Sequence, residues 1–411
     1  MGGGPPIAQL EATFERRFGE PASAVARAPG RVNLIGEHID YCGLPVVPMA
    51  LSRSVRLLFR PRADGRVRIE TTARGLGASE FRVAARIDPA PRGHWSNYPR
   101  AAVQAVAGDP SRGPASGAWA GFDGLVSSDL PIAAGLSSSS ALVVATALAT
   151  LAANRRASLP GGGLDVAARR RLATVLAEGE RYVGTAGGGM DQAVALLGRA
   201  GCAIRLDFEP LRATPIPVPS EWRVVVAHSG ERAEKSASAQ TVYNERTREA
   251  LGALEAVRPA VGAATDAGYP DLVSRGNVQE LLAAARRTLE SPLDARFRHI
   301  VTEADRVERF VAALRVGDRK VAGELLLASH ASLRDDYEVS TPRLDALVEA
   351  AVSAGAYGAR LTGAGLGGCM LALCGSETAE RVEVALRSGA AGPGNPVFTA
   401  RPGEAASVSA L

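Results

Sequence analysis

Residues 127–145 read SSDLPIAAGLSSSSALVVA and connect the end of an expected strand to an expected helix. That helix is apolar on nearly every side, which indicates burial between two layers of structure. Gly135 and four serines stand directly before it. Glycine permits positive φ angles and a close backbone approach, and a helix start directs its unpaired N–H groups and the positive end of its dipole outward. The stretch predicts an anion site, with a serine-rich helix cap that binds nothing as the alternative.

This anion site would contain no lysine. The sequence has no GxxxxGK[ST] phosphate loop, and its only lysines are Lys235 and Lys320. A nucleotide bound here would therefore depend mainly on backbone N–H groups, serine hydroxyls and a metal ion to neutralise its charge.

Two more glycine-rich blocks lie farther along the chain. Asp191 follows the sequence GGGM at the start of another apolar helix. The three glycines would leave the space in front of its carboxylate open to a substrate, although a lone Asp at such a turn is also a common N-cap. Glu180, in the preceding helix, would suit Mg²⁺ together with a serine hydroxyl of the first block, because Mg²⁺ prefers oxygen ligands. The third block, RLTGAGLGGCMLAL, begins at Arg360 and leads into a strand.

Residues 30–41, GRVNLIGEHIDY, concentrate four polar groups among glycines and aliphatic residues. These groups are Arg31, Glu37, His38 and Asp40. A surface loop could carry such a set by accident, so their meaning depends on the rest of the chain.

Composition limits the class of protein. The 411 residues allow two domains with separate cores, and 46% hydrophobic with 22% charged residues are typical of a soluble globular protein. The net charge of +4 arises from scattered basic residues, so neither a nucleic-acid nor a membrane partner is expected. Four cysteines without a CxxC pair indicate reduced thiols rather than zinc or disulfides. The N-terminus lacks the pattern of a secretory signal, and no apolar run is long enough to span a membrane, so we expect a cytoplasmic enzyme. The sequence does not indicate its oligomeric state.

The order of expected elements predicts the architecture. Strands are expected in VRLLFRP from Val55 and in RVRIETT from Arg66, and the Asp-Gly turn between them predicts a hairpin. Asp165 is expected to cap the helix that follows it. From about residue 231 to 352 the pattern is strongly helical. A strand-rich half joined to a helical half predicts an α+β fold with a cleft where they meet.

Together these blocks resemble the galactokinase branch of the GHMP small-molecule kinases, over almost the whole chain. GRVNLIGEHIDY resembles the galactokinase signature, GLSSSSA the second superfamily motif and LTGAGLGGC the third, and HASLRDDYEVSTPRLDALV from His330 is similar to a further galactokinase stretch. The resemblance implies a two-domain α+β fold with the active site between the domains. Residues 1–215 would form an N-terminal mixed-sheet domain and residues 216–411 a ferredoxin-like αβ domain.

The resemblance also implies the reaction. A member of this branch would use ATP and Mg²⁺ to phosphorylate the anomeric hydroxyl of a galactose-type sugar. Ile39, Cys42 and the triple glycine before Asp191 are closer to N-acetylgalactosamine kinase, so galactose and N-acetylgalactosamine both remain candidate substrates. The triple glycine would be compatible with room for an acetamido group.

Matching the family motifs position by position assigns a role to each candidate residue. Asp191 would be the catalytic base, and Arg31 would steady both the base and the transferring phosphoryl group. Trp95 would lie near the adenine, and Ser139 and Glu180 would bind Mg²⁺. The sugar ligands would be Glu37, His38, Ile39, Asp40, Gly188 and Tyr243, and the nucleotide-phosphate loop would be Ala133, Ala134, Gly135, Leu136, Ser137, Ser138 and Ser139.

Two alternatives remain open. Ala133 and Ala134 replace residues that are often glycine or serine in related kinases, which would weaken nucleotide binding if either position needs positive φ. A non-catalytic galactose- and ATP-binding regulator is therefore one alternative. A kinase for another sugar, such as arabinose, galacturonate or galactosamine, is the other.

Overall fold

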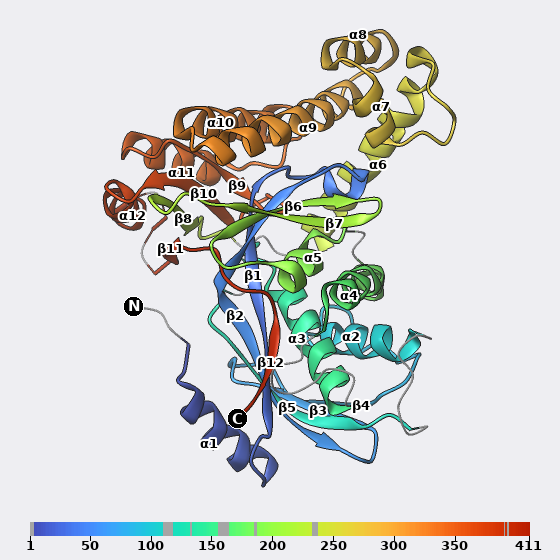
Figure 1. Cartoon of the computed structure of the whole chain (residues 1–411), viewed down its shortest axis with the longest axis vertical. Helices are drawn as coiled ribbons and strands as arrows, with labels where there is room; N and C mark the ends of the chain where they lie inside the picture. The colour runs from blue at the N-terminus through green and yellow to red at the C-terminus, as the bar shows by residue number, and fades with distance from the viewer. Residues whose placement is uncertain are drawn as a thin grey trace.

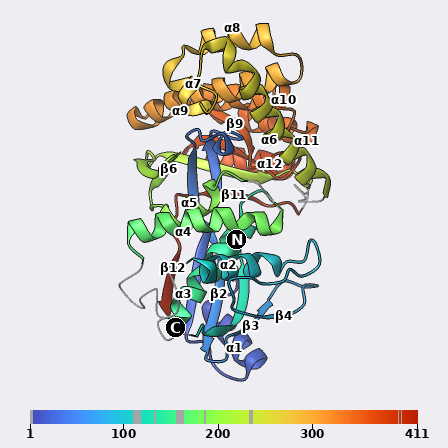
Figure 2. The same ribbon diagram turned by 90° about the vertical axis from the view of Figure 1, so that its right-hand side faces the viewer.

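The structure is a computed structural model that describes residues 4–109, 118–131, 134–154, 164–184, 187–231, 237–389, 391–392 and 394–411. It has an elongated shape, with α1 (Ile7–Phe18) at one end and the helices α7 (Tyr269–Arg275) and α8 (Val278–Thr288) at the other (Figure 1, Figure 2). Strands and helices are combined in layers, which confirms the predicted α+β architecture. Within the described ranges no helix has the length and apolarity needed to span a bilayer.

A six-stranded sheet organises the half of the molecule that contains α1. Its strand order is β12-β1-β2-β5-β3-β4. The strands, in chain order, are β1 (Ala24–Ile35), β2 (Val47–Arg62), β3 (Arg66–Thr71), β4 (Ser79–Arg82), β5 (Gly121–Ser128) and β12 (Ser407–Ala410). The last strand of the chain thus pairs antiparallel with the first.

The predicted hairpin between β2 and β3 is wrong. β5 lies between these two strands, antiparallel to β2 and parallel to β3. An Asp-Gly turn only reverses the chain locally, and pairing is decided by burial. β5 is buried along nearly its whole length, so it takes an interior position, while the mostly exposed β4 forms the edge.

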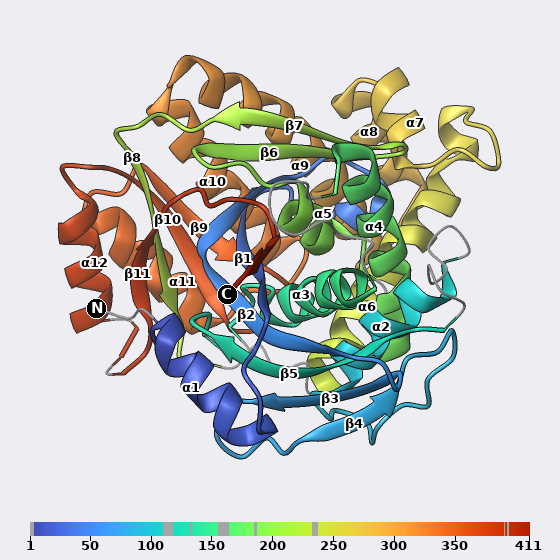
Figure 3. The ribbon, with the colours of Figure 1, turned by 60° about the horizontal axis from the view of Figure 1, so that its bottom comes forward.

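Helices α3 (Ser138–Ala153) and α5 (Met190–Leu197) cover one face of this sheet, and α2 (Asn97–Gly108) and α4 (Val166–Gly179) pack against these two helices (Figure 3). α3 packs against β1 and β2 and also against α2 and α5. It is buried from Ser140 to Ala152, which confirms the prediction of a helix enclosed between layers. Asp165 accepts a hydrogen bond from the N–H of Ala168 at 2.7 Å and so caps α4 as predicted.

The second half of the chain forms a four-stranded antiparallel sheet and a group of helices. The strand order is β11-β8-β10-β9, with β8 (Trp222–His228), β9 (Gly358–Thr362), β10 (Cys369–Gly375) and β11 (Val397–Ala400). The helices that pack on it are α10 (Arg319–Asp335), α11 (Pro342–Ser353) and α12 (Ala379–Ser388). The long helix α9 (Leu293–Val316) packs on α10 and also on α6 (Ala237–Val257).

The hairpin of β6 (Cys202–Phe208) and β7 (Leu211–Pro217) packs against β2 and α5 of the first half and against α9 of the second. One continuous apolar core includes residues from both halves of the chain. The division into residues 1–215 and 216–411 stays a prediction, and its boundary falls inside β7. All four cysteines are buried and unpaired with one another, in agreement with the prediction of reduced thiols.

Polar contacts also join the two halves near the end of β1. The N–H of Asn33 donates to Thr362 Oγ1 at 2.9 Å, and Arg360 donates to the carbonyl of Leu34 at 3.2 Å. The end of β1 is therefore attached to β9 and to the glycine block that follows it. This junction brings the distant sequence blocks to one place.

Candidate active site

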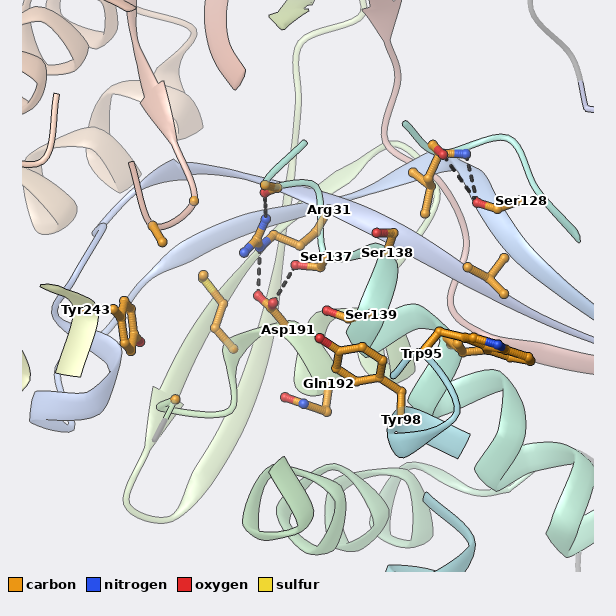
Figure 4. Close-up of a pocket in the computed structure, with 18 of the residues that line it drawn as sticks. Arg31, Trp95, Tyr98, Ser128, Ser137, Ser138, Ser139, Asp191, Gln192 and Tyr243 are labelled. Atoms are coloured by element: carbon orange, nitrogen blue, oxygen red, sulfur yellow. Dashed lines mark hydrogen bonds and ion pairs between the residues drawn. The ribbon is translucent and has the colours of Figure 1, made fainter. Parts of the chain in front are cut away.

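A single cavity of about 730 Å³ collects residues from all three glycine-rich blocks and from the polar segment 30–41. Figure 4 shows its central part, with Asp191 lying near Arg31 and near Ser137, Ser138 and Ser139. Tyr243 lies on one side of this group, and Trp95 and Tyr98 lie on the other. The blocks that are far apart in the sequence thus share one site.

Asp191 stands in the first turn of α5 and is held by two blocks. Arg31 Nε donates to Asp191 Oδ1 at 2.8 Å. Ser137 Oγ donates to Asp191 Oδ2 at 2.5 Å, and Ser140 Oγ does so at 3.3 Å. The carboxylate side chain nevertheless remains 25% exposed. It is therefore oriented by the protein while one side faces the cavity.

The loop before α3 is held against β1 and the third glycine block. Arg31 donates from Nη1 to the carbonyl of Gly135 at 2.6 Å, and its backbone N–H donates to the carbonyl of Leu136 at 3.2 Å. Ser137 adopts φ 57°, a left-handed conformation that directs the chain into α3. A Cβ on Gly363 would lie 2.8 Å from the carbonyl oxygen of Gly135, so only glycine allows this approach.

The predicted phosphate loop divides into cavity residues and core residues. Gly135, Ser137, Ser138 and Ser139 line the cavity together with Asp191 of the second glycine-rich block. Ala134 and Leu136 are 1% exposed and belong to the apolar core. Ala133 lies outside the described residues.

Glu37 is buried in the cavity wall and paired with an arginine. Arg360 Nη2 donates to Glu37 Oε2 at 2.6 Å, and the Glu37 residue is 3% exposed. Burial raises the pKa of Glu37 to about 7, although the positive charges of Arg360 and Arg31 oppose the shift. This carboxylate can therefore gain or lose its proton near neutral pH.

His38 lines the cavity, but both ring nitrogens have partners within the protein. Nε2 lies 3.2 Å from the carbonyl of Ala364, and Nδ1 lies 3.1 Å from the hydroxyl of Tyr41. A carbonyl only accepts, so Nε2 carries the proton and the Tyr41 hydroxyl donates to Nδ1. Burial lowers the pKa of His38 to about 3, so the ring is neutral. The ring packs against Tyr243 with centroids 5.5 Å apart.

Asp40 and Gly188 lie against each other in the cavity wall. A Cβ on Gly188 would lie 2.4 Å from the carbonyl carbon of Asp40 and 2.5 Å from the backbone nitrogen of Tyr41. Gly187, Gly188 and Gly189 all line the cavity with Asp191, in agreement with the expected open space before the carboxylate, and at Gly188 the missing side chain also permits this close packing. Burial, reinforced by the charge of Asp191, raises the pKa of Asp40 to about 6.

The remaining predicted sugar ligands are separated by the structure. Tyr243, on α6, lines the cavity beside Glu37, His38 and Asp40. Ile39 is 0% exposed and lies in the apolar core instead of the cavity wall. Its sequence neighbours His38 and Asp40 line the cavity, so membership of the motif alone does not show which side chains face the sugar.

The other end of the cavity is more apolar and contains aromatic rings. Trp95, Tyr98 and Leu76 line it, and Trp95 Nε1 donates to the carbonyl of Gly77 at 3.1 Å. A flat aromatic surface next to a serine-lined loop suits a purine followed by phosphates. The sequence had indicated Trp95, while Tyr98, three residues later in α2, was missed.

A hard cation between these ends would find oxygen ligands. Ser139 lines the cavity, and the amide of Gln192 is fully buried without a hydrogen-bond partner in the described part of the chain. Among the described residues no group of three His, Cys, Asp or Glu side chains could hold a metal by themselves. The side chain of Glu180 lies outside the described residues. The donors present fit a cation that is bound mainly through phosphate and water oxygens.

Sequence reasoning missed several residues of this site. Gln192 directly follows Asp191, Ala364 lies within the third glycine block, and Arg360 opens that block. Proximity to motifs was the available signal for all three. The partners of Ala364 and Arg360, His38 and Glu37, are distant in the sequence, so these contacts could not be anticipated.

Comparisons with known proteins agree on one kind of enzyme. Family models match residues 12–61 (galactokinase galactose-binding signature), 97–199 (GHMP kinases N terminal domain) and 310–391 (GHMP kinases C terminal). A galactokinase of Roseiflexus sp. (strain RS-1) is 40% identical over 369 residues, which are 89% of this chain and 87% of that protein. The galactokinase of Homo sapiens is 35% identical over 376 residues, 89% of this chain and 88% of its own length.

Solved structures give the same picture. The crystal structure of Lactococcus lactis galactokinase complexed with galactose superposes with a TM-score of 0.82 at 29% identity, covering 98% of this chain and 99% of that one. Methanococcus jannaschii mevalonate kinase, at 17% identity, has a TM-score of 0.61 over 92% of this chain and 98% of its own, which shows a shared fold.

Proposed function

This chain belongs to the galactokinase family of the GHMP kinases, and on that basis we propose that it transfers the γ-phosphoryl group of ATP to the anomeric hydroxyl of galactose. The observation that carries the proposal is the Asp191 carboxylate, oriented by Arg31 and Ser137 and still 25% exposed to the cavity. It lies between a wall of polar sugar-signature residues and an aromatic end that suits adenine.

In phosphoryl transfer, the protein contributes mainly by aligning the reactants and stabilising charge, and less by covalent chemistry. We assign Asp191 as the group that accepts the proton of the attacking anomeric hydroxyl. Arg31 contacts Asp191 through Nε and the Gly135 carbonyl of the proposed phosphate loop through Nη1, which supports a role for its guanidinium in stabilising charge on the phosphoryl oxygens. Glu37, Asp40 and Tyr243 would bind the remaining hydroxyls of the sugar, and His38 would support them from its fixed position.

We propose that the phosphates of ATP lie at Gly135 and Ser137–Ser139, with Trp95 and Tyr98 beside the adenine. Mg²⁺, bound with the nucleotide, would neutralise phosphate charge there, and Ser139 and Glu180 are its proposed protein ligands. Ala134 is buried in the core, so its methyl group does not project toward the proposed phosphate site, which supports normal nucleotide binding.

The activity is tested by coupled ADP release with galactose or N-acetylgalactosamine as acceptor. Turnover with galactose is expected, with a higher kcat/KM than for N-acetylgalactosamine, because the backbone of Asp40 and Tyr41 fills the space beside Gly188. Binding of sugar and ATP without turnover would instead support the non-catalytic regulator. A higher kcat/KM for N-acetylgalactosamine, arabinose or galacturonate would change the assigned substrate.

The role of Asp191 is tested by Asp191→Ala. Turnover should fall by about four orders of magnitude or more, because both the acceptor of the proton and the partner of Arg31 are removed. Galactose and nucleotide binding, measured by calorimetry, should change little. Near-normal turnover would exclude Asp191 as the base.

A further inference from the structure

We propose that Arg360 is a positioning residue for the sugar: its guanidinium fixes the Glu37 carboxylate as a charged acceptor for a sugar hydroxyl. The inference rests on the proposed function, because it assumes that Glu37 contacts the sugar. It concerns a residue that lies outside the cavity wall and acts only through its neighbour.

The guanidinium of Arg360 has no freedom to turn away from Glu37. The residue is 0% exposed. Nε donates to the carbonyl of Leu361 at 2.9 Å and Nη1 to the carbonyl of Leu34 at 3.2 Å. Nη2 then donates to Glu37 Oε2 at 2.6 Å. Backbone carbonyls from β9 and β1 therefore aim one nitrogen at one carboxylate oxygen.

A second buried carboxylate lies close by but depends on other groups. Glu303, on α9, has an oxygen 3.7 Å from Arg360 Nη1. Its carboxylate accepts from Arg306 Nε at 2.7 Å, from Ser329 Oγ at 2.7 Å and from the N–H of Gly36 at 2.9 Å. We call Glu37, Arg360, Glu303 and Arg306 the buried charge cluster. Within it Arg360 bonds directly to Glu37, and Arg306 bonds directly to Glu303.

The other charges that face Glu37 cannot replace Arg360. Arg31 on β1 is engaged by Asp191, and Asp40 and Asp191 are themselves carboxylates. His38 and His299 have pKa values lowered by burial to about 3 and about 4, so both are neutral at pH 7. The cation that bonds directly to Glu37 among the described residues is therefore Arg360, which holds the pKa of Glu37 down at about 7 against the effect of burial.

Loss of this cation has a defined consequence. Glu37 would keep its proton to higher pH, and a neutral carboxyl accepts hydrogen bonds more weakly than a carboxylate. One pKa unit corresponds to about a tenfold change in the charged fraction on the acid side. Sugar binding at pH 7 should weaken, and raising the pH should restore it.

The test compares Arg360→Met and Arg360→Lys with Arg306→Met. Wild-type galactose phosphorylation is measured first, and its absence would overturn the proposed function regardless of Arg360. For Arg360→Met we expect KM and Kd for galactose at pH 7 to rise about tenfold or more, with a smaller effect on kcat. The acid limb of kcat/KM should move upward by about one pH unit or more. Arg360→Lys keeps the positive charge but lacks the planar, multiply donating guanidinium. It should therefore change the galactose affinity and the acid limb of kcat/KM less than Arg360→Met does.

Arg306→Met is the matched control, since Arg306 belongs to the same cluster and does not bond to Glu37. It should lower the melting temperature while leaving the KM for galactose and the pH profile unchanged. In a Glu37→Gln background, Arg360→Met should add no further loss of sugar affinity. A wild-type KM and pH profile in Arg360→Lys together with Arg360→Met would overturn the inference. So would an equal rise of KM in Arg306→Met.

Should Arg360→Met not fold, two measurements still decide the question. Glu37→Gln/Arg360→Met replaces the buried ion pair by two neutral groups and should fold, with the sugar affinity of Glu37→Gln alone. Arg360→Lys with an unchanged acid limb would then contradict the positioning role.

Discussion

At the scale of single residues, the site is a set of carboxylates with unequal surroundings. Asp191 is bonded by Arg31 and Ser137, Glu37 by Arg360, while Asp40 sits nearest to other negative charge. The pKa values of Glu37 and Asp40 are raised to about 7 and about 6. Their protonation should therefore govern sugar binding in a range close to neutrality.

Galactose binding should weaken as the pH falls from 8 to 5.5. Both pKa values lie above the ordinary ones, so each carboxylate is charged above its folded-state pKa and becomes neutral below it. We expect Kd to rise roughly tenfold per pH unit between about 7 and 6, where Glu37 alone gains a proton, and up to roughly a hundredfold per unit below about 6, where Asp40 also gains one, as measured by calorimetry. Glu37→Gln should remove the upper part of this dependence. A Kd independent of pH over the whole range would contradict the assignment of both carboxylates.

The same raised pKa values have the opposite effect on folding stability, which should fall as the pH rises. A carboxyl whose pKa is higher in the folded chain than in the unfolded chain contributes stability at low pH and loses it as the pH rises. For Glu37 the loss falls between its ordinary value of 4.5 and about 7. Glu37→Gln should therefore flatten the denaturation midpoint against pH within that window, which urea titration can measure.

Gln192 provides a stability test of a residue next to the base. Both polar atoms of its amide are buried and have no partner among the described residues. An unpaired buried polar group costs about 1–3 kcal/mol. Gln192→Met, of similar shape, should raise the melting temperature of the ligand-free protein. A clear loss of stability would show that the amide is hydrogen-bonded in solution.

Much of this residue-level site could be predicted, for a physical reason. Arg31, Asp40 and Asp191 belong to family motifs whose residue types serve a single reaction, so their presence in one cavity could be expected. Ile39 and Leu136 stand in the same motifs yet face the core, since alternation between wall and core depends on local backbone turns. The bonds of Arg360 depend on a partner in a distant segment, which single-sequence patterns do not encode.

At the scale of elements, the structure explains which patterns misled. The turn between β2 and β3 has hairpin chemistry, but β5 separates the two strands. The buried helix α3 and the cap at Asp165 were predicted correctly, because apolarity and capping are local properties. Pairing between strands is decided by burial across the whole sheet and could not be read from the turn.

The close contact between the loop before α5 and the short helix at Asp40–Cys42 predicts the effect of Gly188→Ala. The added Cβ would meet the backbone at Asp40 and Tyr41 within 2.6 Å, so that segment must shift. We expect the KM for galactose to rise about tenfold or more, together with a loss of about 1–3 kcal/mol in unfolding free energy. Steady-state kinetics and urea denaturation measure the two effects.

Gly252→Ala is the matched control for this substitution. Gly252 lies in α6, and a Cβ there would meet nothing within 4 Å. Alanine should stabilise the helix by about 0.5–1 kcal/mol and leave the KM unchanged. An unchanged KM in Gly188→Ala would mean that the Asp40 segment moves without consequence for the sugar.

At the scale of the whole molecule, the two halves share one core and one site. Apolar residues of both sheets belong to the same cluster, and the buried charge cluster links the segment after β1 with β9 and α9. Such a structure should unfold as one unit, in contrast to a chain of loosely linked domains.

Galactose should therefore stabilise the entire chain in a single transition. A ligand at one hundred times its Kd adds about 2.7 kcal/mol. For 411 residues this corresponds to a rise in melting temperature of about 3 °C. Scanning calorimetry with and without galactose measures it. Two transitions, of which galactose shifts only one, would show that the halves unfold independently.

The long sequence separation of the Glu37–Arg360 pair has a consequence for synthesis on the ribosome. The two residues are 323 positions apart, and the strand that completes the first sheet beside β1 consists of residues 407–410. At about 5–20 residues per second, the sugar-binding segment waits roughly 15–65 s for its arginine after it has been translated. Until then the nascent chain contains an unpaired β1 edge and an acidic group without its counter-charge. Emergence of β9 and β12, rather than emergence of the first half, is thus the moment at which this kinase can assemble its active site.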